Sequence, residues 1–167
     1  MALNLDSKKV VVDEVAQYAS KALSVVAAEY RGLTVSELTE LRKAARETDV
    51  YLRVVKNSLA KRAVAGTEFE CMQEGLTGPL ILAFSMEAPG AAARVINDFA
   101  KSNDKLIPKV IGFDGQSLDI SELARLASMP TRDEGIALIM AVMKAPVGKL
   151  VRILDAVKDQ KQESEAA

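Results

Sequence analysis

The sequence predicts an α/β (α+β) fold, with a small sheet of about four strands flanked by helices and followed by a separate C-terminal helical extension. Three observations lead to this prediction. Hydrophobic residues make up 49% of the 167 residues, which is enough for a packed core. Short apolar runs alternate with amphipathic segments over residues 1–130, as the strands and helices of a layered domain do. After Pro130, no strand candidate remains.

The first five elements follow from the spacing of their apolar residues. Three- and four-residue steps indicate a helix, and a short continuous apolar run indicates a buried strand. Thr34 and Glu37 have the spacing of a capping box, in which both side chains satisfy early helix amides. Asn57 and Ser58 are typical of a helix start, and Gly66 is typical of a helix end. In chain order, these elements are a helix over residues 6–21, a strand over 23–30, a helix over 34–45, a strand over 50–55 and a helix over 57–66.

Five further elements complete the predicted domain. Pro89 suits the first turn of a helix, and the pair Asp114-Gly115 is typical of a tight turn after a strand. Asp119 is expected to cap a short helix that Pro130 terminates. In chain order, these elements are a helix over residues 68–75, a strand over 79–84, a helix over 89–103, a strand over 106–113 and a helix over 119–130.

The domain boundary is expected near residue 130. Residues 131–161 have the composition of helices, broken once at Pro146 because proline removes the helical hydrogen bond to Val142. Residues 162–167 are polar and are expected to form a disordered tail. The sequence therefore predicts a domain over residues 1–130, docking helices over 131–161 and a tail over 162–167.

The residue types present favour a binding protein over an enzyme. The chain has no histidine and one cysteine, Cys71, which excludes an internal disulfide, Cys/His zinc sites and histidine-based catalysis. It has no glycine-rich phosphate loop and no Gly-x-Ser-x-Gly turn, and no cofactor is expected. Cys71 has a helical spacing and is expected to lie in the core.

The sequence also indicates a cytoplasmic location. No apolar run approaches the roughly 18 residues that a membrane helix needs, so no membrane partner is expected. The first nine residues lack the charged leader and apolar stretch of a secretory signal.

A local basic cluster is hidden by the formal net charge of −1. Between Tyr51 and Arg62 the chain has no acidic residue and four basic ones: Arg53, Lys56, Lys61 and Arg62. Lys56 lies at a strand-to-helix turn, where free helix amides favour an anion. Because aromatic residues are few, the cluster favours recognition of RNA by backbone and shape over base stacking. The alternative is a solvated basic face with ordinary helix caps.

The C-terminal extension carries two apolar stripes. The first consists of Ile136, Ile139, Met140 and Met143, and the second, eleven residues further on, of Val147, Leu150, Val151 and Leu154. Eleven residues are close to three helical turns, so the stripes lie on nearly the same face. A second step of eleven residues reaches only Lys158, Lys161, Gln162 and Glu165, which are polar. Open apolar stripes suit partner helices. The alternative is an amphipathic helix packed on its own domain.

Five short motifs occur in order along the chain: residues 30–35 (YRGLTV), 39–43 (TELRK), 54–59 (VVKNSL), 75–79 (GLTGP) and 145–150 (APVGKL). Together they resemble the bacterial large-subunit ribosomal protein ten, the stalk-base protein. The resemblance covers essentially the whole chain. Each motif is weak by itself, but the series of five is specific.

The resemblance implies a function that the composition does not. Members of this family bind large-subunit ribosomal RNA through the front domain, beside a neighbouring stalk-base ribosomal protein. Their C-terminal helix holds dimers of the acidic stalk protein, which recruit translational GTPases, and several members repress their own messenger. The RNA role carries over to Arg31, Gly32, Leu33, Lys56 and Asn57, to which local charge adds Arg53, Lys61 and Arg62. The two stripes predict two stalk dimers. The alternatives are a cytosolic helix-mediated adaptor with no RNA partner and, third, an α/β enzyme.

Overall fold

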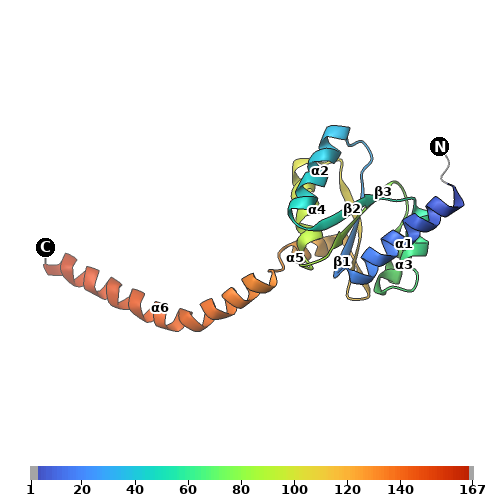
Figure 1. Ribbon diagram of the computed structural model, residues 1–167. Helices are drawn as coiled ribbons and strands as arrows, with labels where there is room; N and C mark the ends of the chain where they lie inside the picture. The colour runs from blue at the N-terminus through green and yellow to red at the C-terminus, as the bar shows by residue number, and fades with distance from the viewer. Residues whose placement is uncertain (1–3, 166–167) are drawn as a thin grey trace. The chain divides into compact units, whose positions relative to one another are not determined.

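The computed structural model describes residues 4–165, with side chains up to residue 159. The chain forms two units, Met1–Met129 and Pro130–Ala167 (Figure 1). We refer to the first as the front unit. The second contains the long helix α6 (Arg132–Glu165).

The front unit contains one antiparallel sheet of five strands in the order β2-β3-β1-β4-β5. This confirms the predicted fold class and adds one strand to the expected four. The additional strand, β5, has three residues and pairs with β4 across the predicted Asp114-Gly115 turn, in which both residues have a positive φ. Three residues are too few to produce a recognisable apolar pattern. The strands are β1 (Ser24–Glu29), β2 (Val50–Val54), β3 (Leu80–Ser85), β4 (Ile107–Phe113) and β5 (Gln116–Leu118).

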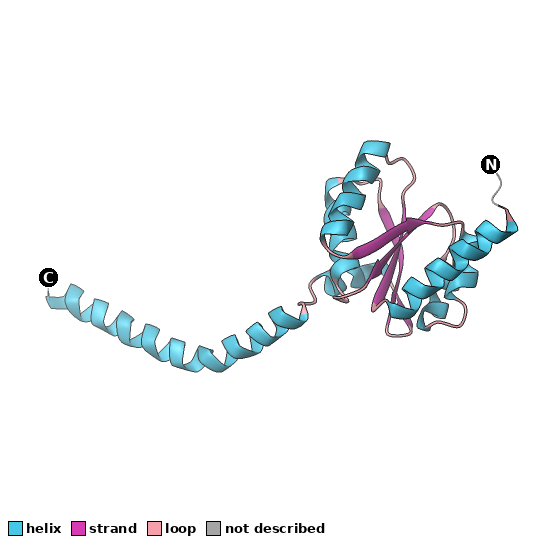
Figure 2. Ribbon diagram, viewed as in Figure 1, coloured by secondary structure: helices cyan, strands magenta, loops and turns pink. Residues whose placement is uncertain are grey.

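Helices cover both faces of the sheet (Figure 2). The central strand β1 shows this arrangement directly, because successive side chains of a strand point to opposite faces. Val25 and Ala27 belong to one core cluster with residues of α1, α3 and η1, and Val26 and Ala28 to another with residues of α2, α4 and α5. The helices of the front unit are α1 (Leu5–Lys21), α2 (Val35–Glu47), α3 (Asn57–Val64), η1 (Glu68–Gly75), α4 (Ala91–Ser102), η2 (Ile120–Glu122) and α5 (Leu123–Ala127).

The prediction that Cys71 lies in the core is wrong, because its side chain is exposed. The reason is the type of helix. The η1 segment is a 3₁₀ helix with three residues per turn, so residues three apart share a face. Phe69 and Met72 occupy the inward positions, each only 1% exposed, and Cys71 turns outward.

Two predicted helix caps differ from the structure. Asp119 is the N-cap residue of η2, but its side chain makes no capping hydrogen bond. The α3 helix begins at Asn57, but Lys56 is its N-cap residue. The Asn57 side-chain amide instead donates to the carbonyl of Gly78 at 2.8 Å, a partner 21 residues away that local spacing does not reveal.

The predicted break at Pro146 is also wrong, because α6 passes through Pro146 without interruption. Proline removes one helical hydrogen bond, but its fixed φ is compatible with a helix. The ribbon changes direction near the middle of α6 (Figure 1), and a proline inside a helix is a common cause of such a bend. The helix also includes residues 162–165 of the predicted disordered tail, whereas residues 166 and 167 lie outside the described residues.

None of the helices described between residues 4 and 165 is long and apolar enough to span a membrane.

Candidate RNA interface and docking helix

Segments that are distant in the sequence meet at one end of the sheet. Because β1 and β3 are antiparallel, Glu29 at the end of β1 lies opposite Leu80 at the start of β3. Likewise, Val54 at the end of β2 lies opposite Ile81. The result is a concavity of about 390 Å³, lined by Tyr30, Val54, Val55, Lys56, Asn57, Ser58, Gly78, Pro79 and Leu80. We call it the sheet-end pocket.

Lys56 and Asn57 lie where β2 leads into α3, in the sheet-end pocket. The first amides of a helix have no partner within the helix and carry the positive end of its dipole, so this position favours an anion. Lys56 is exposed, and its ammonium makes no ion pair with a described residue. The bond from Asn57 to Gly78 fixes the start of α3 against the loop before β3. A phosphate oxygen at this position can therefore accept hydrogen bonds from the first amides of α3 and pair with the exposed Lys56 ammonium.

The turn at Arg31-Gly32 follows β1. Gly32 has a φ of 88°, a conformation that other residues rarely adopt, so glycine is required for this turn. The Arg31 side chain is 77% exposed, and its Nε lies 3.4 Å from a Glu29 carboxylate oxygen. Leu33 is half-buried and packs against the core cluster of α2 and α4. The structure thus places Arg31 where a ligand can reach it, and Leu33 mainly as a packing residue.

Two lysines that no sequence motif indicates, Lys105 and Lys109, lie near this turn. Lys109 lies 3.2 Å from Glu29 and donates to the Thr77 carbonyl at 3.3 Å, and Lys105 lies 3.2 Å from Glu37. The pairing of β4 with β1 brings them here, because Ile107 lies opposite Glu29. No local spacing carries this signal, so only the strand order could have revealed it.

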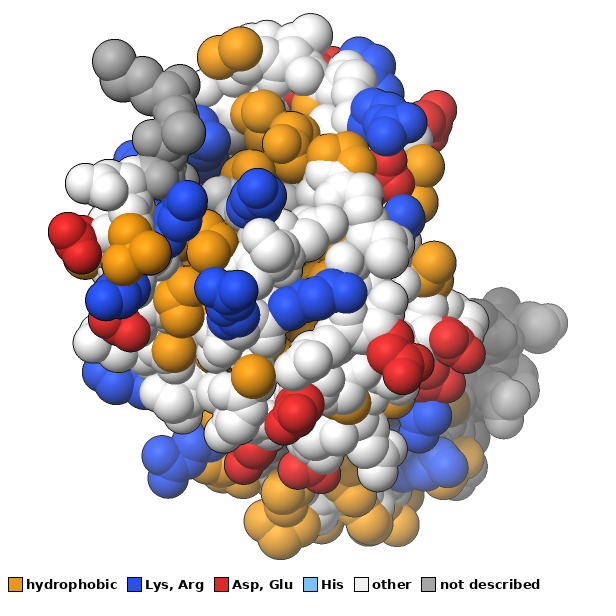
Figure 3. Space-filling model, turned by 90° about the vertical axis from the view of Figure 1, so that its right-hand side faces the viewer, with side chains coloured by type: hydrophobic (Ala, Val, Ile, Leu, Met, Phe, Trp, Pro, Cys, Tyr) orange, Lys and Arg blue, Asp and Glu red, His pale blue; other side chains and the backbone are white. Residues whose placement is uncertain are grey.

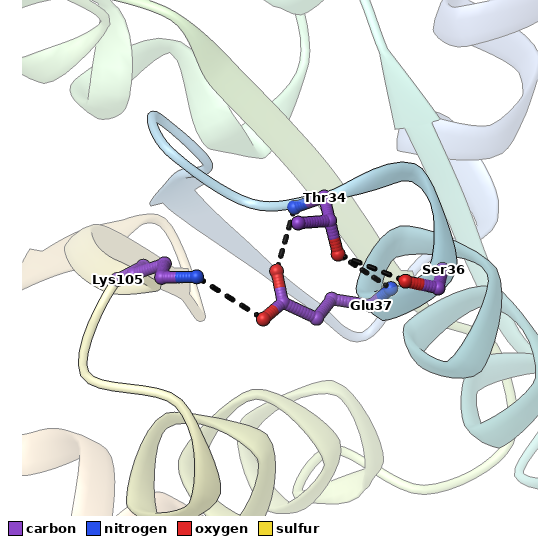
Figure 4. A network of polar contacts seen from close by, with 4 residues as sticks. All are labelled: Thr34, Ser36, Glu37 and Lys105. Atoms are coloured by element: carbon purple, nitrogen blue, oxygen red, sulfur yellow. Dashed lines mark hydrogen bonds and ion pairs between the residues drawn. The ribbon is translucent and has the colours of Figure 1, made fainter.

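The Glu37 carboxylate fastens the start of α2 (Figure 4). It accepts hydrogen bonds from the Thr34 amide at 2.6 Å and from Lys105 at 3.2 Å, while the Thr34 hydroxyl accepts from the Glu37 amide at 3.3 Å. This confirms the predicted capping box. The Thr34 amide, followed by the Thr34 hydroxyl and Lys105, lowers the pKa of the Glu37 carboxyl below its usual value.

This lowered pKa gives a pH-dependent prediction. A group whose pKa is lower in the folded state stabilises the fold above its unfolded pKa, which is about 4.3 for glutamate, and loses this contribution as the pH falls through the folded value. Glu37→Gln is therefore expected to melt below the wild type at pH 7, and the gap is expected to narrow as the pH drops below about 4. Thermal melts of both proteins over this range provide the measurement. A gap that stays constant down to acid pH would show that the charge of Glu37 contributes nothing.

Arg53 has a different environment from Lys56. It lies on the edge strand β2, as expected, but its guanidinium forms an ion pair with Glu14 of α1. Tyr51 donates to Glu14 and accepts from Arg53, both at 2.8 Å, and its ring stacks on Tyr18 at 3.7 Å between centroids. The Arg53 hydrogen bond, followed by that of Tyr51, lowers the pKa of the Glu14 carboxyl. Arg53 thus fastens α1 to the sheet and is less available to a phosphate.

Lys61 and Arg62 lie on α3, beyond the residues that line the sheet-end pocket. Lys61 is half-buried and Arg62 is exposed. Arg62 lines a second concavity, between α3 and α1. The eight predicted RNA-binding residues therefore do not form one patch. Arg31, Gly32, Lys56 and Asn57 lie at the sheet end, whereas Arg53 and Arg62 lie on the α1 side.

Both apolar stripes of α6 are exposed to solvent. Their eight side chains are between 48% and 68% exposed. Helix α6 also has exposed apolar residues that the stripe pattern did not include: Leu138, Val142, Ile153 and Val157. A second capping box starts the helix, with the Thr131 amide donating to Glu134 at 2.8 Å and the Glu134 amide to Thr131 at 3.4 Å.

Comparison with known proteins gives a consistent result over the whole chain. A family model described as "Ribosomal protein L10" matches residues 3–101, and one described as "Ribosomal protein uL10 C-terminal region" matches residues 129–167. The chain is 61% identical to large ribosomal subunit protein uL10 of Thioalkalivibrio sulfidiphilus, over 98% of this chain and 99% of that protein. It is 60% identical to the protein of the same name from Methylococcus capsulatus, over 97% and 99% of the two chains, and 53% identical to that from Erwinia tasmaniensis, over 99% and 100%.

Proposed function

Because the chain belongs to the ribosomal protein L10 family, whose members are structural and non-catalytic proteins of the large ribosomal subunit, we propose two binding roles for it. The front unit binds large-subunit ribosomal RNA, and α6 anchors dimers of the acidic stalk protein. The expected location is the cytoplasmic ribosome of a bacterium.

The observation that carries the RNA role is the meeting of three motifs at one place. Tyr30, Lys56 and Gly78 come from different parts of the sequence and line the same pocket. The pocket offers the first amides of α3, the exposed Lys56 ammonium and, beside it, the exposed Arg31. Backbone amides and basic side chains are the groups with which proteins contact nucleic-acid phosphates.

The charge distribution on α6 supports an acidic partner. From Ile136 to Leu154, the charged residues are Lys144, Lys149 and Arg152, all of them basic. They lie together on the side of α6 away from the stripes, where they line one concavity with Val142 and Pro146. Their positive charge therefore attracts an acidic partner to the helix, and the stripes provide its apolar contact. Complementary charge of this kind increases the association rate and fixes the orientation of the complex.

Replacing cations of the sheet-end pocket tests the RNA role. Lys56→Gln is expected to weaken binding to a stalk-base ribosomal-RNA fragment and to reduce the magnitude of the log–log salt slope by about 0.7–0.9, the effect of one lost phosphate contact. Arg31→Ala is expected to lose more affinity, because a guanidinium can bind a phosphate through two hydrogen bonds. Filter binding at several salt concentrations measures both quantities.

Lys101→Gln is the control, because Lys101 is an exposed lysine of α4. Equal affinities and slopes for Lys56→Gln, Arg31→Ala and Lys101→Gln would leave the sheet-end pocket without an RNA role.

A further inference from the structure

The second concavity of the front unit lies between α1 and α3. It has a volume of about 270 Å³ and is lined by Leu5, Lys8, Lys9, Val12, Asp13, Leu59 and Arg62. We call it the α1–α3 groove. Its α1 residues recur at three- and four-residue steps and so share one helix face. Leu5, Val12 and Leu59 provide an apolar floor, and Lys8, Lys9 and Arg62 provide positive charge.

The cations of this groove are unpaired. The side chains of Lys8, Lys9 and Arg62 make no hydrogen bond or ion pair with any residue in the described part of the chain. Arg31, Arg53 and Lys109 differ, because each lies beside a carboxylate. A phosphate can therefore approach the groove without displacing an internal partner. Asp13 is the one acid in its lining and leaves an excess of positive charge.

The groove continues the interface at the sheet end. Helix α3 contributes Asn57 and Ser58 to the sheet-end pocket, and Leu59 and Arg62 to the α1–α3 groove. One polyanion that follows α3 can therefore reach both. Figure 3 shows the side of the front unit on which α1 and α3 lie, with Lys and Arg side chains across its middle.

We propose that the α1–α3 groove holds an unpaired nucleotide of the bound RNA. The base lies on Leu5, Val12 and Leu59, and its flanking phosphates contact Lys8, Lys9 and Arg62. This inference rests on the proposed RNA-binding function and adds a second contact to it. The volume lies below the roughly 300–1,000 Å³ of small-molecule pockets, which suits one base better than a longer segment. Unpaired nucleotides of loops and bulges are the parts of a folded RNA whose bases a protein can contact directly.

Two substitutions separate the phosphate contacts from the base contact. Lys8→Gln with Lys9→Gln is expected to lower RNA affinity about tenfold and to reduce the magnitude of the salt slope by about 1.4–1.8, the effect of two phosphate contacts. Leu5→Asn changes no charge, so it is expected to lower affinity about threefold, by loss of apolar contact, and to leave the slope unchanged.

A charge-matched control is Lys21→Gln with Lys101→Gln, which removes two exposed lysines, one at the far end of α1 and one on α4. If the melting temperatures of all variants equal that of the wild type, a difference in affinity reflects RNA binding and not loss of the fold. If Lys56→Gln weakens binding while the Lys8/Lys9 variant matches this control, the groove proposal is overturned and the RNA function stands. If neither Lys56→Gln nor the Lys8/Lys9 variant weakens binding, both the groove proposal and the proposed RNA-binding function are wrong.

The nature of the ligand is tested by cleavage of the RNA from a tethered iron chelate. Because Cys71 is the only cysteine and is exposed, Cys71→Ser gives a cysteine-free background into which Lys9→Cys or Lys21→Cys can be introduced. A chelate at position 9 is expected to cleave the RNA at unpaired nucleotides. A chelate at position 21 is expected to cleave it only weakly. Cleavage confined to a regular duplex would overturn the nucleotide assignment, and no cleavage from position 9 would leave the groove to a protein partner.

Discussion

A chain that ends after Pro130 is expected to lose all binding of the acidic stalk protein and to bind the stalk-base RNA as tightly as the full-length protein. All eight residues of the apolar stripes lie beyond the cut. The front unit keeps its core, because every buried apolar side chain in the described structure lies between Val15 and Leu126. Both candidate RNA contacts, the sheet-end pocket and the α1–α3 groove, are also retained. Native mass spectrometry and filter binding measure the two activities.

The position of the cut follows from the contacts at the end of the front unit. The Arg94 guanidinium donates to the carbonyls of Ala127 at 2.9 Å and Met129 at 2.6 Å. Ending the chain after Pro130 preserves both bonds, whereas ending it at Ala127 would remove one carbonyl. The shorter chain is therefore a useful comparison and is expected to melt at a lower temperature. If the chain that ends after Pro130 is insoluble or does not bind RNA, α6 completes the front unit.

The elements predicted correctly are those specified by neighbouring residues. The start of α2 follows from Thr34 and Glu37, three residues apart, and the structure contains both of their hydrogen bonds. Where the prediction was wrong, a competing local geometry or a distant partner was decisive. Three residues per turn expose Cys71, and the loop before β3 engages Asn57. Helix α6 continues through Pro146, because the fixed φ of proline is compatible with a helix.

The candidate RNA site could be predicted only in part, for a related reason. Lys56 and Arg31 are recognisable from the turns that precede and follow regular elements. Lys105 and Lys109 depend on the pairing of β4 with β1, which the order of elements along the sequence does not determine. Arg53 has the same charge as Lys56 and lies three residues away, but strand alternation directs it toward α1 and Glu14. Charge clustering along a sequence thus overestimates the size of a binding site when a strand and a helix divide the cluster.

The wild-type chain is expected to bind two stalk dimers, one on each apolar stripe of α6. The stripes are eleven residues apart, lie on one continuous helix and are exposed along their whole length. Pro146 separates them, and the bend near the middle of α6 suits two docking segments better than one. A further eleven-residue step meets only polar residues, so no third dimer is expected.

Aspartate substitutions in one stripe test this number. Leu150→Asp with Leu154→Asp is expected to leave one dimer bound in native mass spectrometry, because the first stripe is unchanged. Burial of each leucine contributes about 1.5–3 kcal/mol, so losing two lowers the affinity of the second stripe by roughly two to four orders of magnitude, before the cost of burying the new charges. The matched control is Ile139→Asp with Met143→Asp, the positions eleven residues earlier, which is also expected to leave one dimer. All four substitutions together are expected to leave none. Three dimers on the wild-type chain, or none on either double variant, would contradict this number, because each stripe is expected to bind its dimer independently.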